Sequence, residues 1–307
     1  MTLRAAVLGT GAWARTIHLP GLAHHPQIEL VGVWGRDPSA TASAAAEAGV
    51  PAFGDLGELL SSVDLVSLAV TPAAQVPLAV VAAHAGAHLV LEKPAAQDAA
   101  GCRDLEAAVR LAGVEATVFL SRLWDPARQA WLARAAASPW ETISYEWVSA
   151  GMRPGMPGAQ GWRKQVGPLL DVAPHIVSIV EFVAGPVVAV DAATTDAQSR
   201  VVLTLRHAGG CVTTARLDLF APVTSTHECV TLSTGAAEER WGNPSPVDFP
   251  GAYRAMLNDL LARIEEPGRL SPRGDESSVA RACAMAELLD EASRVLTGDH
   301  ARGPTDS

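Results

Sequence analysis

A short apolar strand and a glycine-rich turn open the chain, in the stretch Ala5-Ala6-Val7-Leu8-Gly9-Thr10-Gly11-Ala12-Trp13-Ala14. Gly9 permits a tight turn, Gly11 lets backbone N–H groups approach a pyrophosphate, and Ala14 lets the following helix pack close to a sheet. Strand, glycine turn and helix follow in the order that a GxGxxA dinucleotide fingerprint requires. The stretch therefore predicts the first unit of a Rossmann domain, with an unrelated glycine turn as the alternative.

Predicted strands and helices alternate along the chain as far as residue 120. The expected strands are 5–8, 28–34, 65–70, 88–93 and 115–120, and the expected helices include 39–48, 79–85 and 98–111. This alternation is typical of a doubly wound parallel sheet. We therefore predict an α/β fold class with an NAD(P)-binding Rossmann domain over residues 1–122.

The apolar run of one of these strands ends at two charged residues and a proline, Glu92-Lys93-Pro94. Proline has no N–H and disfavours helical geometry in the residue before it, so Lys93 is expected to lie extended at the carboxyl edge of the sheet. Ligands of open α/β sheets bind at that edge. Thr71, Pro72 and Gln75 follow the preceding strand and are expected beside the dinucleotide, although residues in such positions often only cap a turn.

The end of the second strand bears on the choice of nicotinamide cofactor. An NAD site usually places a carboxylate there, whereas an NADP site has a small residue and an arginine for the 2′-phosphate. The strand ends Trp34-Gly35-Arg36-Asp37, so Gly35 and Arg36 favour NADP(H). NAD(H) stays possible because a shift of one residue would bring Asp37 to the ribose, and Asp37 could equally cap the next helix.

The remainder of the chain loses the β/α alternation. Longer strands are expected at 142–149, 187–195, 200–207, 212–220 and 227–233, and two helices at 253–264 and 278–296. The pattern predicts an α+β second domain over residues 123–307 with an open, mainly antiparallel sheet, whose last helices could pack back on the first domain. Such an open sheet must cover its outer face or expose apolar area, so a homodimer or homotetramer formed through that face is expected.

An apolar helix in the second half carries a polar stripe. Asp171, His175 and Ser178 recur at i, i+4 and i+7 in an otherwise apolar segment, so they share one face. Buried polar groups in a line need partners or a polar cavity. Pro174 leaves a second possibility open, in which the helix begins near Pro174 and Asp171 lies in the preceding turn. A histidine held by a backbone carbonyl is the alternative for His175 alone.

Composition excludes several classes of function. The net charge of −10 argues against nucleic acid and anionic membranes as partners. The four cysteines show neither metal-ligand spacing nor a disulfide framework, so free buried thiols and no metal site are expected. No apolar run reaches the roughly 20 residues of a membrane span. The first strand begins at once, without a signal peptide, which predicts a cytoplasmic protein.

These motifs together resemble the glucose-fructose oxidoreductase / inositol dehydrogenase / rhizopine-catabolism (Gfo/Idh/MocA) family. The likeness is carried, in order along the chain, by the GxGxxA start, by Glu92-Lys93-Pro94 and by Trp162-Arg163 … Gly167 … Asp171-xxx-His175. It implies a nicotinamide oxidoreductase acting on sugars, inositols and related polyols, with Lys93, Asp171 and His175 as the catalytic residues. Gln75, where the family often has His, Pro168, and Ser178, where an acid is common, depart from the pattern and bear on the substrate.

Hydride transfer requires a bound cofactor, an acid/base group and a donor at the reacting oxygen. His175 is expected as the acid/base and Lys93 as the hydrogen-bond donor, with Lys93 as proton donor a close variant. The residues expected at the cofactor are Gly9, Thr10, Gly11, Ala12, Trp13, Ala14, Gly35, Arg36, Thr71, Pro72, Gln75, Glu92 and Lys93. The residues expected at the substrate are Lys93, Arg122, Trp162, Arg163, Asp171 and His175.

Two other functions fit the same sequence. The first is reduction of a non-sugar carbonyl or imine, and the second is a non-catalytic NADP-binding regulator, since one fold can host both kinds of protein.

Overall fold

The chain divides into two compact units in the computed structural model. The structure describes residues 2–156, 161–196, 198–242, 246–273 and 275–297. The first unit joins the chain up to Arg128 with Val247–Ala284, and the second joins Gln129–Pro246 with the chain from Met285 onward. The division thus falls after Arg128, beyond the expected boundary at residue 122, and a later segment belongs to the first unit.

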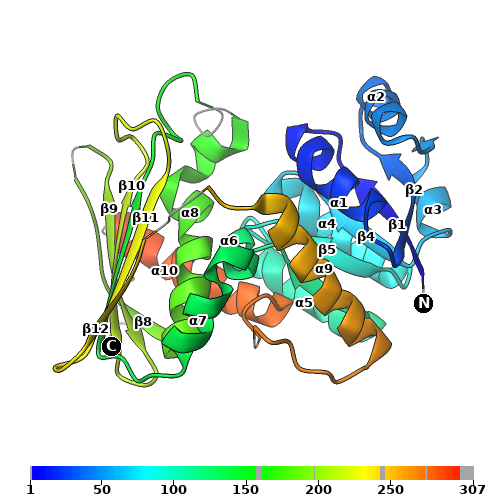
Figure 1. Cartoon of the computed structure of the whole chain (residues 1–307). Helices are drawn as coiled ribbons and strands as arrows, with labels where there is room; N and C mark the ends of the chain where they lie inside the picture. Colours follow the sequence, from blue (N-terminus) through cyan, green and yellow to red (C-terminus); the bar gives the residue numbers. More distant parts are fainter. Residues whose placement is uncertain (1, 157–160, 197, 243–245, 274, 298–307) are drawn as a thin grey trace, which may run out of the picture. The chain divides into compact units, whose positions relative to one another are not determined.

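The first unit contains a six-stranded parallel sheet (Figure 1). Its strands are β1 (Leu3–Leu8), β2 (Ile28–Trp34), β3 (Ala52–Phe53), β4 (Leu65–Leu68), β5 (His88–Leu91) and β6 (Ala116–Val118). They lie in the order β3-β2-β1-β4-β5-β6, which is the doubly wound order with a switch point between β1 and β4. The predicted fold class is confirmed for this unit.

Helices and caps follow the local sequence signals. The helices of the first unit are η1 (Ala14–His18), α1 (Leu19–Ala23), α2 (Pro38–Ala48), α3 (Leu56–Leu60), α4 (Pro72–His84), α5 (Ala99–Ala112), α6 (Ser121–Trp124), η2 (Pro126–Arg128) and α9 (Phe249–Glu265). Asp98 caps the start of α5 by accepting a hydrogen bond from the Gly101 N–H at 2.8 Å. Gly49 and Gly113 end α2 and α5 in the left-handed conformation that glycine adopts without strain.

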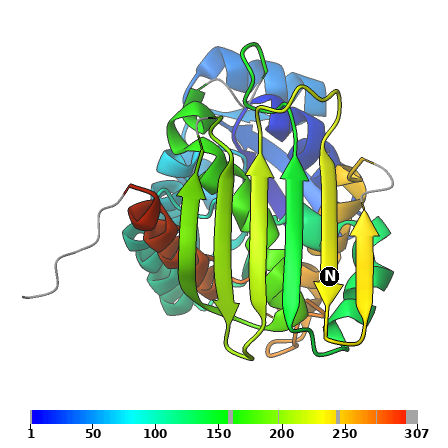
Figure 2. The same ribbon diagram turned by 90° about the vertical axis from the view of Figure 1, so that its left-hand side faces the viewer.

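The second unit contains a six-stranded mixed sheet, seen on its face in Figure 2. Its strands are β7 (Thr142–Val148), β8 (Val187–Thr195), β9 (Val201–His207), β10 (Val212–Asp218), β11 (His227–Ser233) and β12 (Glu238–Gly242), in the order β12-β11-β7-β10-β9-β8. All described pairs are antiparallel except β7 with β10. The prediction of a mainly antiparallel sheet is confirmed.

One face of this sheet is apolar, and the other mixes polar side chains with valines. Ile143, Tyr145 and Trp147 of β7 are buried, and Tyr145 pairs with Ala215 of β10, which is also buried. The opposite face carries rows of Thr, Ser and charged side chains in which Arg206 pairs with Asp191 at 2.8 Å. Apolar side chains also occur among these polar ones, and Val188 of β8 is 58% exposed. The homodimer or homotetramer stays a prediction, which light scattering would test.

The helices of the second unit are α7 (Gln129–Ala136) and α8 (Gly161–Ala184), and α10 (Val279–Thr297) begins in the first unit and ends in the second. Within α8, Gly167 alone is non-helical, with φ 70° and ψ −178°. The helix then continues through Pro174, so the alternative in which it begins near Pro174 is wrong. A proline costs one backbone hydrogen bond, and buried apolar neighbours on both sides of it keep the helix intact.

The four cysteines are buried free thiols, as expected. Cys283 Sγ lies 2.7 Å from Cys102 Sγ in the first unit. Across the described residues, none of the helices has the length and apolar character needed to cross a bilayer.

Candidate active site

The glycine turn after β1 has the geometry that the fingerprint requires. Gly9 has φ +131°, and a Cβ there would collide with the Ala69 carbonyl at the end of β4. A Cβ on Gly11 would meet no atom within 4 Å, so no protein neighbour explains the glycine. Close approach of a pyrophosphate to the backbone does explain it. Ala14 is fully buried, as close packing of the helix on the sheet requires. The residues present at this turn fit a bound dinucleotide.

The end of β2 shows a second reason for a small residue. A Cβ on Gly35 would lie 2.8 Å from Thr10 Cγ2 and 2.9 Å from Thr41 Oγ1. Packing therefore requires glycine whichever cofactor binds. The Asp37 carboxylate accepts hydrogen bonds from Ser39 N at 2.8 Å and Ala40 N at 3.1 Å, so it caps α2. Arg36 is exposed at the same edge of the sheet.

Lys93 lies two residues beyond β5, at the same edge as the glycine turn because all strands of the sheet are parallel. The peptide bond between Lys93 and Pro94 is cis. Gln75 is fully buried, and its amide nitrogen donates to the carbonyls of Glu92 at 2.7 Å and Ala95 at 3.0 Å. The Glu92 N–H donates back to Gln75 Oε1 at 2.8 Å. Gln75 thus holds the main chain that carries Lys93, a role the sequence did not suggest.

The other residues expected at the cofactor surround these two turns. Thr71 precedes α4 with extended backbone, and its carbonyl accepts from the N–H of Gln75 at 3.0 Å. Pro72 is buried as the first residue of that helix, where its missing N–H costs nothing. Ala12 is exposed and Thr10 partly so, directly at the glycine turn.

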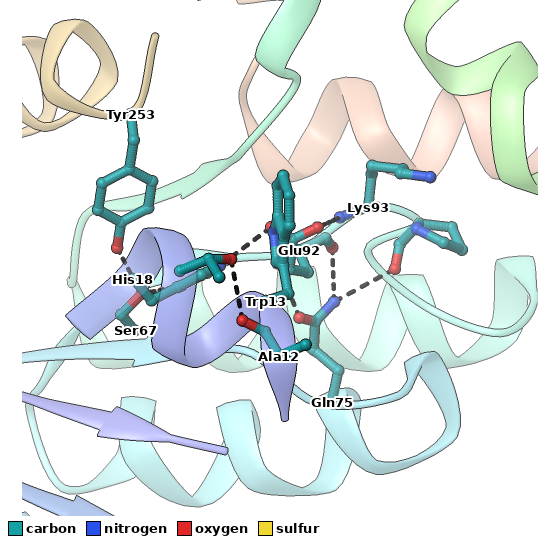
Figure 3. Close-up of polar contacts among 10 residues, drawn as sticks. Ala12, Trp13, His18, Ser67, Gln75, Glu92, Lys93 and Tyr253 are labelled. Atoms are coloured by element: carbon teal, nitrogen blue, oxygen red, sulfur yellow. Dashed lines mark hydrogen bonds and ion pairs between the residues drawn. The ribbon is translucent and has the colours of Figure 1, made fainter. Parts of the chain in front are cut away.

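Behind the glycine turn lies a buried polar cluster that joins four elements (Figure 3). Trp13 Nε1 donates to Glu92 Oε1 at 2.7 Å, and His18 Nε2 lies 3.1 Å from the same oxygen. His18 Nδ1 lies 2.8 Å from Ser67 Oγ, which lies 2.7 Å from the Tyr253 hydroxyl. Burial raises the pKa of Tyr253, so its hydroxyl stays protonated and can donate. Figure 3 shows the Lys93 side chain extending away from this cluster.

In the second unit, α8 brings three of the predicted residues together. Asp171 and His175 lie one helical turn apart, and Arg163 Nε pairs with Asp171 Oδ1 at 3.3 Å. The buried His175 ring stacks on Trp147 of β7, with ring centroids 6.1 Å apart and planes at 10°. Ser178 is buried and donates to the His175 carbonyl at 3.0 Å, so it supports the helix backbone.

Two predicted substrate residues have different surroundings. Arg122 is buried in α6, where its guanidinium lies 5.5 Å from the centre of the Phe249 ring. Phe249 in turn meets Trp13 edge-on at 5.1 Å. Trp162 falls within α8, and its side chain lies outside the described residues. Lys93 and Arg122 thus belong to the first unit, and Arg163, Asp171 and His175 belong to the second.

Sequence reasoning missed His18, Ser67, Tyr253 and Trp147. Single polar residues in apolar segments were the available signal, since His18 lies in the first helix and Ser67 in a wholly buried strand. A buried polar group predicts a partner, but it does not say which residue supplies it.

A doubly wound sheet with a glycine turn at its switch point defines a dinucleotide-binding Rossmann protein. Residues 3–120 match the GFO_IDH_MocA model, described as an oxidoreductase family with an NAD-binding Rossmann fold. Residues 3–120 therefore match this family, and the resemblance inferred from the motifs is confirmed for that part of the chain.

Known proteins share the wider fold. D-Apiose dehydrogenase from Paraburkholderia graminis is 29% identical over 244 residues, which cover 76% of this chain and 62% of that protein. A myo-inositol dehydrogenase from Corynebacterium glutamicum superimposes with a TM-score of 0.82 at 18% identity, covering 98% of both chains. Levoglucosan dehydrogenase, solved with NADH and levoglucosan, gives a TM-score of 0.81 at 17% identity, covering 98% of both chains. The chain spans only about half the length of the first curated relatives it matches, 53% and 51%.

Proposed function

We propose that this protein is a nicotinamide-dependent oxidoreductase that transfers a hydride between NADP(H) and a sugar, an inositol or a related polyol or keto-sugar. The observation that carries the proposal is the position of Lys93. It follows β5 at the carboxyl edge of a sheet whose switch point holds a glycine turn suited to a dinucleotide. The sugar and inositol dehydrogenases that share the fold support the substrate class.

The residues of the chain divide the work as follows. The backbone N–H groups of the Gly9–Gly11 turn would hold the pyrophosphate of the dinucleotide. When bound, the nicotinamide supplies or accepts the hydride. His175 exchanges the proton of the reacting hydroxyl, and Lys93 donates a hydrogen bond to the same oxygen. Asp171 and Arg163, paired at 3.3 Å, orient neighbouring hydroxyl groups of the substrate.

A screen of cofactor consumption tests this function. NADPH and NADH are followed at 340 nm with keto-sugars, inososes and dicarbonyls, and NADP⁺ and NAD⁺ with the corresponding polyols. With the best substrate, Lys93→Ala and His175→Ala are expected to lower turnover by roughly 10²- to 10⁴-fold. Retention of more than a third of wild-type turnover by either variant would exclude the assigned roles.

The preference for NADP(H) is supported by two features at the end of β2. Arg36 is exposed just after β2, where an NADP site usually has an arginine for the 2′-phosphate, and the Asp37 carboxylate is engaged in capping α2. Fluorescence titration should show tighter binding of NADPH than of NADH. Arg36→Ala should weaken NADPH binding by about tenfold and leave NADH binding unchanged, since only NADPH carries the charge that Arg36 meets. Equal loss for both cofactors would contradict this preference.

A further inference from the structure

We infer that Tyr253, Ser67 and His18 are positioning residues, which fix the Glu92 carboxylate and through it the main chain at Lys93. This inference rests on the proposed function, because it assigns these residues to the reaction in which Lys93 takes part. None of the three is exposed, and they come from three different elements: α9, β4 and η1.

With a neutral His18 imidazole, the hydrogen bonds of the cluster run in one consistent direction. Glu92 Oε1 accepts the Trp13 N–H, and it can accept from His18 only if Nε2 carries a proton. In the neutral imidazole, Nδ1 then accepts from the Ser67 hydroxyl, which accepts from the Tyr253 hydroxyl. In this arrangement every donor in the row of hydrogen bonds has an acceptor, and the last acceptor is the Glu92 carboxylate.

The far end of this row of hydrogen bonds, at Tyr253, has no access to solvent. The side chains of Tyr253, Ser67 and His18 are all fully buried. A proton relay needs an exit to water, which these residues do not provide. A satisfied buried network instead fixes the orientation of its members. The structure thus favours a positioning role over proton conduction.

The π-helix η1 explains how one carboxylate oxygen meets two side chains of the same segment. The Leu19 N–H donates to the Ala14 carbonyl, five residues back. In an α-helix, residues five apart would point about 140° away from each other. The wider π-turn brings Trp13 and His18 toward the same side, where both reach Glu92 Oε1. Single π-turns of this kind are frequent at functional sites.

The Glu92 carboxylate, held by this cluster, also contacts the main chain of Lys93. Its Oε2 accepts from the Lys93 N–H at 3.3 Å, and its own main chain is held by Gln75. Glu92 is therefore held at its carboxylate by the cluster and at its main chain by Gln75 of α4. The Tyr253 hydroxyl touches neither Lys93 nor the glycine turn. Its loss should nevertheless change the surroundings of the Lys93 backbone amide.

Selective labelling can read this amide directly. The chain contains only two lysines, Lys93 and Lys164, so protein labelled with [¹⁵N]lysine gives two backbone amide signals, which Lys164→Arg assigns. Tyr253→Phe and Ser67→Ala are each expected to move the Lys93 signal in the same direction by more than a line width. The double variant should add little, because both changes break one chain. An unmoved Lys93 signal in both single variants would overturn the inference.

The only other tyrosine supplies a matched control. Tyr145 is also fully buried, and its hydroxyl donates to Glu228 Oε2 at 2.9 Å within the second unit. Tyr145→Phe removes an equivalent buried hydroxyl and should leave the Lys93 signal in place. If both tyrosine variants move the signal alike, the effect is a general loss of packing and the inference fails.

Kinetics separate this inference from the proposed function. With a substrate from the screen, Tyr253→Phe should lower kcat by about 3- to 10-fold and leave the KM for cofactor unchanged. Unchanged kcat would contradict a positioning role in the reaction. If the wild type turns over none of the compounds, the proposed function fails, while the Lys93 signal still decides whether the cluster positions that residue.

Discussion

At the scale of single residues, His88 links pH to stability. Its Nδ1 accepts a hydrogen bond from the Glu115 N–H at 2.9 Å, which requires an unprotonated nitrogen. Burial lowers the pKa of His88 although the charges of Glu115 and Asp64 oppose the change. The unfolded chain, with a histidine pKa near 6.5, therefore binds more protons than the native state below that pH. The free energy of unfolding should fall as the pH drops from about 6.5 toward the lower native pKa.

Urea unfolding at pH 8 and pH 5 tests this link. His88→Asn keeps an acceptor for the Glu115 N–H and does not titrate, so it should lose less stability between the two pH values than the wild type. His207, whose pKa burial also lowers, stays in both proteins and contributes equally to each. An identical acid loss in wild type and variant would show that His88 does not titrate in this way.

At the scale of elements, α4 and the segment after β5 are held together by one amide. Gln75 Nε2 donates to the carbonyls of Glu92 and Ala95, and Oε1 accepts the Glu92 N–H. Each buried group left without its partner costs about 1–3 kcal/mol. Gln75→Leu should therefore lower the free energy of unfolding by roughly 2–4 kcal/mol. Equilibrium urea unfolding measures this change.

A second substitution distinguishes hydrogen bonding from packing. Gln75→Glu preserves the shape of the side chain but turns the donor toward the carbonyl oxygens of Glu92, Pro94 and Ala95 into an acceptor. Only the protonated acid restores a donor, so Gln75→Glu should be less destabilising at pH 5 than at pH 8 relative to wild type. A pH-independent cost equal to that of Gln75→Leu would mean that packing alone matters at this position.

The elements that the sequence predicted best are those with local signals at both ends. Helix α5 was expected at 98–111 and spans Ala99–Ala112, because Asp98 caps its start and Gly113 its end. Strand β12 was missed. It reads Glu-Glu-Arg-Trp-Gly over Glu238–Gly242 and is an edge strand paired only with β11, so charge conceals its pattern. The His18–Ser67–Tyr253 contacts join residues 49 and 186 positions apart, a separation that no local pattern records.

At the scale of the whole molecule, the first unit is discontinuous in sequence. Its α9 buries Tyr253, Met256, Leu257 and Leu260 completely, although this helix follows the second sheet in the chain. The segment also supplies the Ser277 carbonyl, which accepts from the Val118 N–H of β6 at 2.8 Å. A division at residue 122 alone leaves this segment out of the first unit, and the expectation that the last helices could pack back on the first domain allowed for it.

The size of this contribution predicts how fragments behave. Burial of a large apolar side chain contributes about 1.5–3 kcal/mol, so removing the four α9 side chains would cost roughly 6–12 kcal/mol. A domain is stable by only about 5–15 kcal/mol in total. A fragment of residues 1–128 should therefore show no cooperative thermal unfolding by circular dichroism. Residues 1–128 joined to 247–284 by a flexible linker should unfold cooperatively. Cooperative unfolding of the 1–128 fragment alone would show that the core of the first unit is stable without α9.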